Sequence, residues 1–139
     1  MATATSHWLL KSEPDCYGFD HLVREGETLW DGVRNAQAAN NLKAMAVGDP
    51  VLFYHSGAHP SVVGLAEVTA SAFPDPGDAT GRFVAVRVRP MRALPRPVPL
   101  SVIKADPSLA QMALVRQGRL SVTPVSAEEW ARILQLAQA

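Results

Sequence analysis

The sequence predicts an α+β fold: a small, mostly antiparallel β-barrel of five or six strands with short flanking helices. Two observations carry this prediction. Of the 139 residues, 47% are hydrophobic and 19% are charged, which is typical of a globular domain. Extended segments are interrupted by short helical stretches without regular strand–helix–strand alternation, which disfavours a doubly wound parallel sheet. A chain of this length usually forms one domain, so we expect residues 1–139 to fold together, with residues 1–6 as a flexible tail.

The first elements follow from local signals. His7–Lys11 predicts a strand that stops at Glu13 and Pro14, since a residue before proline avoids helical backbone and proline cannot donate to a ladder. Phe19–Arg24 predicts one or two helical turns. Asn35–Ala46 predicts a longer helix. Its apolar face at helical spacing comprises Ala38, Leu42, Met45 and Ala46.

The middle of the chain predicts strands. Val51–Ser56 and Val62–Ala70 are joined by a short turn-rich segment and predict a hairpin. Arg82–Arg89 predicts a strand whose two faces carry Val84, Val86 and Val88 on one side and Phe83, Ala85, Arg87 and Arg89 on the other. Residues 90–99 contain four prolines, which should prevent a continuous ladder and leave this segment at an edge or on the surface.

The C-terminal part predicts short elements. Ser101–Ala105 and Ser108–Leu114 suggest short helices, and Leu120–Val125 suggests a closing strand. Ser126 and Glu129 form a capping box that opens a final helix running to about Gln138. The residues of that helix expected to face inward are Trp130, Ile133, Leu134 and Ala137.

Charge is distributed unevenly although the net charge is zero. Zero net charge argues against a protein that coats nucleic acid by bulk attraction. Residues 82–119 nevertheless hold eight basic side chains against Asp106 alone. They are Arg82, Arg87, Arg89, Arg92, Arg96, Lys104, Arg116 and Arg119. This block predicts either a phosphate-facing surface or pairing with acidic groups elsewhere in the fold, and both interpretations stay open.

Several classes of site are disfavoured by composition. The single cysteine, Cys16, excludes an internal disulfide framework and a multi-cysteine metal site. His55 and His59 flank a hairpin, but the four histidines lack a metal-binding spacing on a helix. Phosphate-binding glycine loops are absent. Apolar runs are far too short for a membrane span, and the N-terminus lacks the basic start of a secretory signal. We therefore expect a cytoplasmic protein without a cofactor, a metal or a membrane partner.

Two polar clusters remain as candidate sites. Residues 8–14, Trp-Leu-Leu-Lys-Ser-Glu-Pro, place an amine, a hydroxyl and a carboxylate at the end of a strand, suited to acid–base work or to positioning a polar ligand. A surface ion pair with a turn-making serine is the structural alternative. Residues 30–35, Trp-Asp-Gly-Val-Arg-Asn, precede a helix start, where free backbone N–H groups favour anions. Here the alternative is a tryptophan that anchors the core.

Together with four further motifs, these clusters resemble the EVE domain family, which has many compact bacterial members. The further motifs are Gly48-Asp49 with Phe53-Tyr54-His55-Ser56, Val63-Gly64, Pro74-Asp75, and Arg119-Leu120-Ser121-Val122 with Pro124-Val125. The match runs in order from about residue 7 to residue 134. The resemblance implies a PUA-like fold and a non-catalytic nucleic-acid-binding module, related to YTH domains, whose pocket accepts a flipped, modified base of DNA or RNA.

The resemblance also implies which residues form the site. Trp30 would stack on the base, Ser12 or Asn35 would read its polar edge, and Gly32 would let the backbone approach closely. The whole pocket would comprise Lys11, Ser12, Trp30, Gly32, Val33, Asn35, Phe53, Tyr54, His55 and Ser56. The residues expected to hold flanking phosphates, which position a strand without specifying its sequence, are Lys11, Arg34, Arg116 and Arg119.

One departure from the family concerns the predicted helix. Members often carry Tyr and Arg where this chain has Ala36 and Ala39. On a helix, Ala39 shares a face with Asn35 and Lys43, so the missing arginine removes one plausible phosphate contact. The strength of nucleic-acid binding therefore stays open, as does the choice between DNA and RNA.

Two alternative functions remain. The first is a small hydrolase of a modified nucleoside that uses Lys11, Ser12 and Glu13; turnover of acylated nucleosides abolished by Lys11→Ala would identify it. In an extended strand, adjacent side chains point to opposite faces, so these three cannot meet one substrate without a bulge or turn. The second is a sensor of a free, purine-like small molecule.

Overall fold

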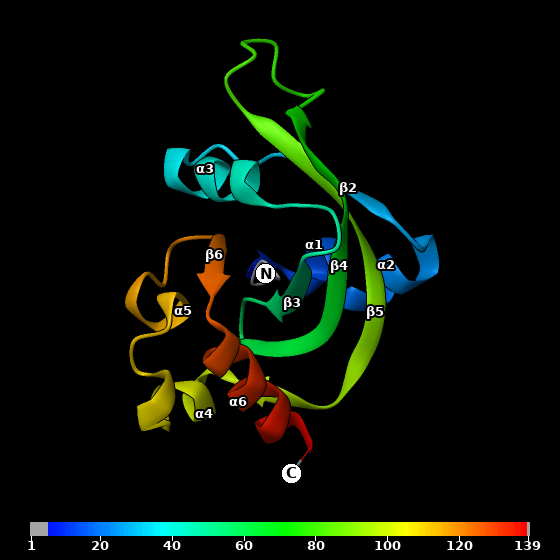
Figure 1. The fold of residues 1–139 in the computed structure, drawn as a ribbon. Helices are drawn as coiled ribbons and strands as arrows, with labels where there is room; N and C mark the ends of the chain where they lie inside the picture. Colours follow the sequence, from blue (N-terminus) through cyan, green and yellow to red (C-terminus); the bar gives the residue numbers. More distant parts are fainter. Residues whose placement is uncertain (1–5, 139) are drawn as a thin grey trace, which may run out of the picture.

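A single curved sheet of six strands organises the computed structural model, which describes residues 6–138 (Figure 1). The strands are β1 (His7–Ser12), β2 (Thr28–Trp30), β3 (Pro50–His55), β4 (Ser61–Pro74), β5 (Val84–Pro99) and β6 (Val122–Val125). Their order across the sheet is β2-β5-β4-β3-β1-β6. Every neighbouring pair is antiparallel except β1 and β3, which run parallel. The mostly antiparallel, six-stranded prediction is confirmed, and the sheet stays open rather than closing.

Short helices fill the connections. They are α1 (Pro14–Tyr17), α2 (Phe19–Glu25), α3 (Ala36–Ala44), α4 (Leu100–Ala105), the 3-10 turn η1 (Pro107–Leu109), α5 (Ala113–Arg116) and α6 (Ala127–Gln138). In Figure 1, α4 and α6 lie at one end of the molecule, the turn between β4 and β5 forms the other, and α5 lies between α4 and α3 along one side. Within the described residues, no helix is long and apolar enough to cross a membrane. Residues 1–5 of the expected flexible tail lie outside the described part of the chain.

The hairpin prediction is confirmed by the antiparallel pairing of β3 with β4. The expectation that prolines prevent a continuous ladder after Arg89 is wrong, because β5 runs on to Pro99. It does so with several shifts in its register against β4. Strand β2 pairs only with residues 86–88, so residues 89–99 lie at an edge of the sheet, as expected. Proline is tolerated at a sheet edge, because the N–H group that it lacks is not needed to bond a further strand there.

Helix predictions differ from the structure mainly at the ends. Asn35 caps α3 as expected, its side chain accepting a 2.9 Å hydrogen bond from the Ala38 amide. The helix ends two residues early, so Ala46 is exposed and Ala39 is buried in its place. Pro14, expected only to end a strand, also starts α1, because proline suits the first position of a helix.

In the C-terminal half, one predicted helix is absent and the predicted capping box is present. The helix expected at residues 108–114 is wrong, since η1 and α5 are separate short elements. The Asp106 carboxylate accepts a hydrogen bond from the Ser108 amide at 2.9 Å, and this bond caps η1 at its N-terminus. The capping box of α6 is confirmed: Ser126 N donates to Glu129 Oε1 at 2.9 Å, and Glu129 N donates to Ser126 Oγ at 3.1 Å.

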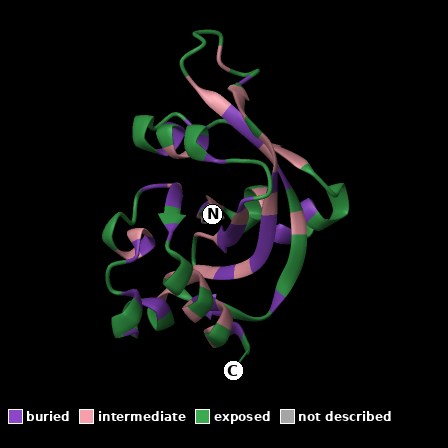
Figure 2. Ribbon diagram, viewed as in Figure 1, coloured by how far each residue is buried: buried purple, intermediate pink, exposed green. Residues whose placement is uncertain are grey.

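Strands β1 and β3 are buried on both faces. Along β1, Trp8 and Leu10 join one apolar cluster and Leu9 joins another on the opposite face. Phe53 and Leu52 of β3 divide in the same way. Figure 2 shows buried residues along the sheet and exposed residues on the outward sides of the helices. Such two-sided burial fixes the strand that carries Lys11 and Ser12 firmly in the molecule.

Gly64 in β4 lies directly against the ring of Phe19. A Cβ atom at Gly64 would stand 2.5 Å from the Cε1 and Cζ atoms of that ring. We expect Gly64→Ala to lower the free energy of unfolding by about 1–3 kcal/mol through overpacking, measured by urea denaturation. In a Phe19→Leu background the cost should shrink. An alanine variant as stable as the parent would contradict this packing.

Candidate functional site

A cavity of about 580 Å³ opens where the end of β1, helix α1, strand β2 and the following loop meet. Its volume lies within the range of small-ligand pockets, roughly 300–1,000 Å³. The lining residues are Lys11, Ser12, Glu13, Cys16, Tyr17, Thr28, Leu29, Trp30, Asp31, Gly32, Val33, Arg34 and Ser121. Both polar clusters singled out in the sequence therefore contribute to one cavity.

Trp30 forms an aromatic wall of this cavity. Its ring meets Phe53 edge-on at 5.6 Å and Tyr17 edge-on at 6.3 Å between centroids. Phe53 is fully buried, so it holds the indole from behind without reaching the cavity surface. Trp30 is thus both a core contact, as the structural alternative proposed, and an indole available to a ligand.

Polar groups at the end of β1 and in α1 are already bonded within the protein. Lys11 Nζ donates to the Gly118 carbonyl at 2.6 Å, and partial burial lowers the pKa of this amine. Ser12 Oγ donates to the Tyr17 carbonyl at 2.6 Å. The Tyr17 hydroxyl donates to Glu25, and burial together with that carboxylate raises the pKa of the phenol. These bonds fix the cavity wall and leave the Ser12 oxygen able to accept.

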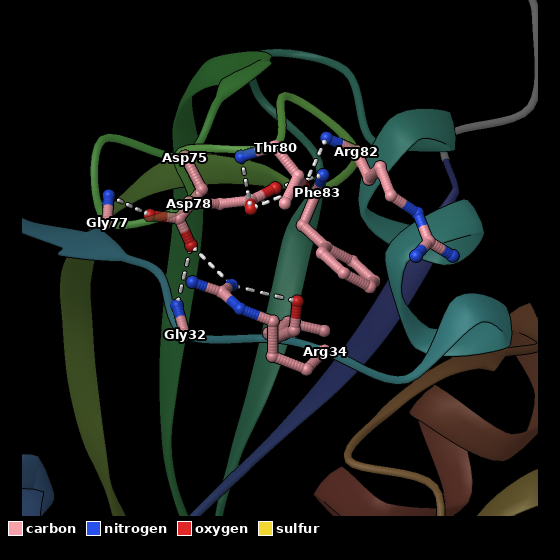
Figure 3. A network of polar contacts seen from close by, with 9 residues as sticks. Gly32, Arg34, Asp75, Gly77, Asp78, Thr80, Arg82 and Phe83 are labelled. Carbon is pink, nitrogen blue, oxygen red and sulfur yellow. Dashed lines mark hydrogen bonds and ion pairs between the residues drawn. The ribbon is translucent and has the colours of Figure 1, made fainter.

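The loop that follows Trp30 is held by Asp75, which lies just beyond the end of β4 (Figure 3). The Asp75 side chain is only 1% exposed. It accepts from the Gly32 amide at 2.9 Å and from an Arg34 guanidinium nitrogen at 2.8 Å, and a third bond comes from the Gly77 amide at 2.7 Å. The Arg34 bond, followed by that of Gly32, lowers the pKa of the Asp75 carboxyl. One carboxylate therefore sets the position of the loop.

A second carboxylate organises the loop that carries Asp75. Asp78 accepts from the Thr80 hydroxyl at 2.6 Å and from the Phe83 amide at 2.8 Å. These bonds, the Thr80 hydroxyl first, lower its pKa to about 2. The Arg34 guanidinium lies over the Phe83 ring, 5.3 Å from its centroid, so it is turned toward this loop (Figure 3).

A groove of about 350 Å³ adjoins the cavity. It is lined by Asn35, Gln37, Arg116, Gln117, Gly118, Arg119 and Leu120. Arg34 of the cavity and Asn35 of the groove are consecutive, as are Ser121 and Leu120, so neighbouring residues of two segments line the two hollows. No carboxylate lines this groove, in contrast to the cavity.

The predicted site residues divide between these places. Lys11, Ser12, Trp30, Gly32, Val33 and Arg34 line the cavity, whereas Asn35, Arg116 and Arg119 line the groove. The end of β3 lines neither. Phe53 and Tyr54 are buried, His55 Nε2 accepts from the Phe19 amide at 3.0 Å, and the Ser56 amide donates to the Ser12 carbonyl at 2.9 Å. Burial lowers the pKa of His55, consistent with its role as an acceptor.

Several lining residues were not expected in the pocket. Tyr17, Thr28 and Leu29 gave no signal in the sequence, and Ser121 appeared only within a family motif, because these residues reach the cavity through tertiary contacts. Glu13 lines it because the chain turns into α1 immediately after β1. That turn brings Lys11, Ser12 and Glu13 to one cavity, which a continuous strand would not do. Among residues 6–138, no three His, Cys, Asp or Glu side chains gather as a metal site would require.

The basic residues of segment 82–119 divide between the two interpretations, since some pair with acidic side chains and others line the groove. Arg87 pairs with Glu27 at 3.1 Å and Arg89 with Glu67 at 2.7 Å, so these two arginines are matched by acids across the fold. Arg116 and Arg119 instead line the groove, and Arg116 donates to the Gln111 side chain at 2.6 Å.

The family model for the EVE domain matches residues 6–136. The chain belongs to the EVE domain family. Human thymocyte nuclear protein 1 is 30% identical over 172 residues, an alignment that covers 99% of this EVE domain chain and 76% of the human protein.

Solved structures agree with this membership. Rpa0253 from Rhodopseudomonas palustris is 43% identical, with a TM-score of 0.92 over 96% of this chain and 94% of its own. The human thymocyte nuclear protein in complex with 5-methylcytosine-containing DNA is 31% identical, with a TM-score of 0.88 over 97% of this chain and 99% of its own. The YTH domain of Zygosaccharomyces rouxii MRB1, in complex with N6-methyladenosine RNA, shares the fold at 18% identity and a TM-score of 0.61, over 98% of this chain and 88% of its own. The fold of this EVE domain is therefore PUA-like.

The Asp75 contacts generate a pH-dependent prediction. Because the pKa of Asp75 is lowered in the folded protein, its contribution is complete above the ordinary Asp pKa of about 3.9 and is lost as the pH falls toward the folded-state value. We expect Asp75→Asn to lower the free energy of unfolding by about 1–3 kcal/mol near neutral pH, since buried amides lose a charged acceptor. The difference from the parent should shrink near pH 3.

Urea denaturation at both pH values measures this effect. Asp15→Asn is the matched control, because Asp15 is exposed on α1 and outside the network. If Asp75→Asn lowered the free energy of unfolding equally at both pH values, the charge of Asp75 would not be what holds the loop.

Proposed function

We propose that this protein is a non-catalytic nucleic-acid-binding module that accepts a modified base, flipped out of DNA or RNA, into the Trp30 cavity. The observation that carries the proposal is the pairing of an aromatic-walled cavity with an adjoining groove that bears two arginines and no carboxylate. The complex of the human relative with 5-methylcytosine-containing DNA supports a modified base as the ligand. Extruding a base costs a few kcal/mol, least when the base is modified or unpaired.

The proposed roles of the cavity residues follow from their geometry. Trp30 stacks on the base, a contact worth about 1–3 kcal/mol. Ser12 reads the polar edge as an acceptor, because its own proton is given to the Tyr17 carbonyl. Gly32, with a positive φ of 77°, bonds through its amide to Asp75 and leaves no side chain between the loop backbone and the ligand. Asn35 uses its carbonyl oxygen to cap α3, so its amide group is the part free to contact the strand.

Arg116 and Arg119 are proposed to hold the phosphates next to the flipped base. Both arginines line the groove next to the cavity. Lys11 of the cavity connects the two hollows, because its amine donates to the carbonyl of Gly118 in the groove. Arg34 was expected to share this role. Because its guanidinium is bonded to Asp75, we propose that it acts on phosphates only through its remaining N–H groups.

We propose binding without turnover. Lys11, Ser12 and Glu13 do share a cavity, but the amine and the hydroxyl each donate to a backbone carbonyl rather than to each other. Ser12 therefore lacks the base that would activate it as a nucleophile. The exposed free thiol of Cys16 suits a reducing compartment, and we propose the cytoplasm as the place of action.

Trp30 provides the first test. We expect Trp30→Ala to weaken binding of oligonucleotides that carry the recognised modification by about tenfold or more, since stacking is lost. Fluorescence titration with DNA and RNA oligonucleotides carrying modified cytosine or adenine measures it, beside unmodified strands and free nucleosides. Trp130→Phe alters a residue of α6 that does not line the cavity, and this variant should keep both the affinity and the quenching. Unchanged affinity of Trp30→Ala for every modified strand would refute the proposal.

Arg116 and Arg119 provide the second test. Each change to alanine should weaken binding to modified and unmodified strands alike and reduce the salt slope of the binding constant by about one. The slope is measured by titration at several salt concentrations. Arg96→Ala is the control, because Arg96 is exposed on β5 and lines neither hollow. Equal slopes for the groove variants and this control would place the strand elsewhere.

A further inference from the structure

We propose that His21 and His55 are positioning residues of the Trp30 cavity, and that protonation of their imidazoles loosens one cavity wall and weakens ligand binding in mild acid. This inference rests on the proposed function. Neither histidine lines the cavity. Both act through the junction of α1 and α2, where Tyr17, the last residue of α1, belongs to the lining.

The two imidazoles accept hydrogen bonds from consecutive main-chain amides at this junction. His21 Nδ1 accepts from the Gly18 amide at 2.8 Å, and His55 Nε2 accepts from the Phe19 amide at 3.0 Å. Gly18 and Phe19 are both buried. The first N–H groups of an α-helix have no acceptor within that helix, so a side chain must supply one where water cannot. The two histidines do this at the start of α2.

The junction sets the position of Tyr17 in the cavity wall. The Tyr17 carbonyl accepts from Ser12 Oγ at 2.6 Å, and the Tyr17 ring meets Trp30 edge-on at 6.3 Å between centroids. The His21 ring stacks on the Tyr17 ring at 5.5 Å, and His55 pairs with Ser12 where β1 and β3 run parallel. A shift of the junction therefore moves Tyr17 and the acceptor that orients the Ser12 hydroxyl.

Protonation removes both acceptors. A neutral imidazole has one nitrogen that accepts, whereas an imidazolium has two donors and no acceptor. In acid, an N–H group of His55 faces the Phe19 amide and an N–H group of His21 faces the Gly18 amide. Each buried amide then lacks a partner, which costs free energy. Because the Phe19 ring is packed against Phe53, we expect the end of α1 to be the part that shifts.

The surroundings of His55 set the pH range. Burial is the largest cause and lowers the pKa of His55, while the charge of Asp20 on α2 acts in the opposite direction. The partners of His55 in the neighbouring strands, Ser12 and Ser61, carry no charge. Because the pKa of His55 lies below the ordinary value of 6.5, its bond to the Phe19 amide is complete above pH 6.5. The bond is lost as the pH falls through the folded-state value.

His21 has a carboxylate as an alternative partner. Its Nδ1 atom lies 3.5 Å from Asp20 Oδ1. Once protonated, this nitrogen can donate to Asp20 but can no longer accept from the Gly18 amide. Its other neighbour, the Tyr17 phenol, donates to Glu25. Protonation of His21 therefore replaces a bond that holds the junction with one that does not.

Glutamine variants separate the acceptor from its titration. The amide oxygen of glutamine accepts but does not titrate, and glutamine at the third position of a helix bonds the N-cap amide in a capping box. The probes are fluorescently labelled single strands that carry 5-methylcytosine in DNA or N6-methyladenosine in RNA. Binding is measured by anisotropy at about pH 8 and about pH 5, the range in which imidazoles change charge.

We expect the affinity of the parent to fall about threefold to tenfold between these pH values, as the loss of hydrogen bonds implies. The double variant His21→Gln, His55→Gln should lose less than about twofold, since its acceptors persist. His59→Gln is the matched control, because His59 is exposed in the turn between β3 and β4 and bonds neither amide. This control should keep the pH dependence of the parent. A merely structural role of the histidines would change affinity equally at both pH values.

The Gly18 and Phe19 amides give a second readout that needs no ligand. In the parent, we expect their backbone NMR resonances to titrate with pH, with the Phe19 midpoint below 6.5. In the double variant, both resonances should stay constant over the same range. Thermal melting checks that each variant folds, and the two single variants replace the double variant if it does not.

Two results would overturn the inference. One is an affinity that falls with pH as steeply in the folded double variant as in the parent. The other is the absence of a pH response at the Gly18 and Phe19 amides of the parent. Either leaves the proposed function intact, provided that binding still depends on Trp30. If no modified strand binds at any pH, the proposed function is refuted, and the amide titration alone decides whether the histidines hold the junction.

Discussion

The buried carboxylate of Asp75 is the constraint on which the candidate site depends. The loop between β2 and α3 supplies Asp31, Gly32 and Arg34 to the cavity but has no strand or helix of its own to fix it. Asp75 supplies that fixation from a distant part of the chain, through the Gly32 amide and the Arg34 guanidinium. The geometry of the ligand cavity is thus tied to the long β4–β5 ribbon, whose end carries the carboxylate.

The remaining cavity wall depends on the central position of β1. Its parallel pairing with β3 and antiparallel pairing with β6 bury the strand on both faces. Because the chain turns into α1 directly after Ser12, the last side chains of a rigid strand emerge at a helix start. A cavity built from one rigid strand end and one pinned loop is formed before a ligand arrives, which reduces the entropic cost of binding.

Local signals in the sequence were sufficient for most elements but for only part of the site. The capping box at Ser126, the Asn35 cap and the β3–β4 hairpin depend on neighbouring residues, and each was predicted correctly. Strand β2 was not, because three residues carry no periodic pattern and are extended only by pairing with β5. Nothing in the sequence around Tyr17 indicates the cavity, and the family motif that contains Ser121 does not show that this serine lines it. The end of β3, expected there by resemblance, lies behind Trp30, where Phe53 supports the indole.

The prolines of β5 also have a consequence for how molecules of this protein meet one another. Beyond Val88, the outer side of β5 has no partner strand among residues 6–138. An unpaired strand edge invites a second copy to add its own strand, which leads to aggregation. Pro90, Pro95, Pro97 and Pro99 offer no N–H group to such a copy, and the arginines between them repel its identical edge. The prolines of β5 therefore allow a long edge strand that is a poor template for a strand of a second copy.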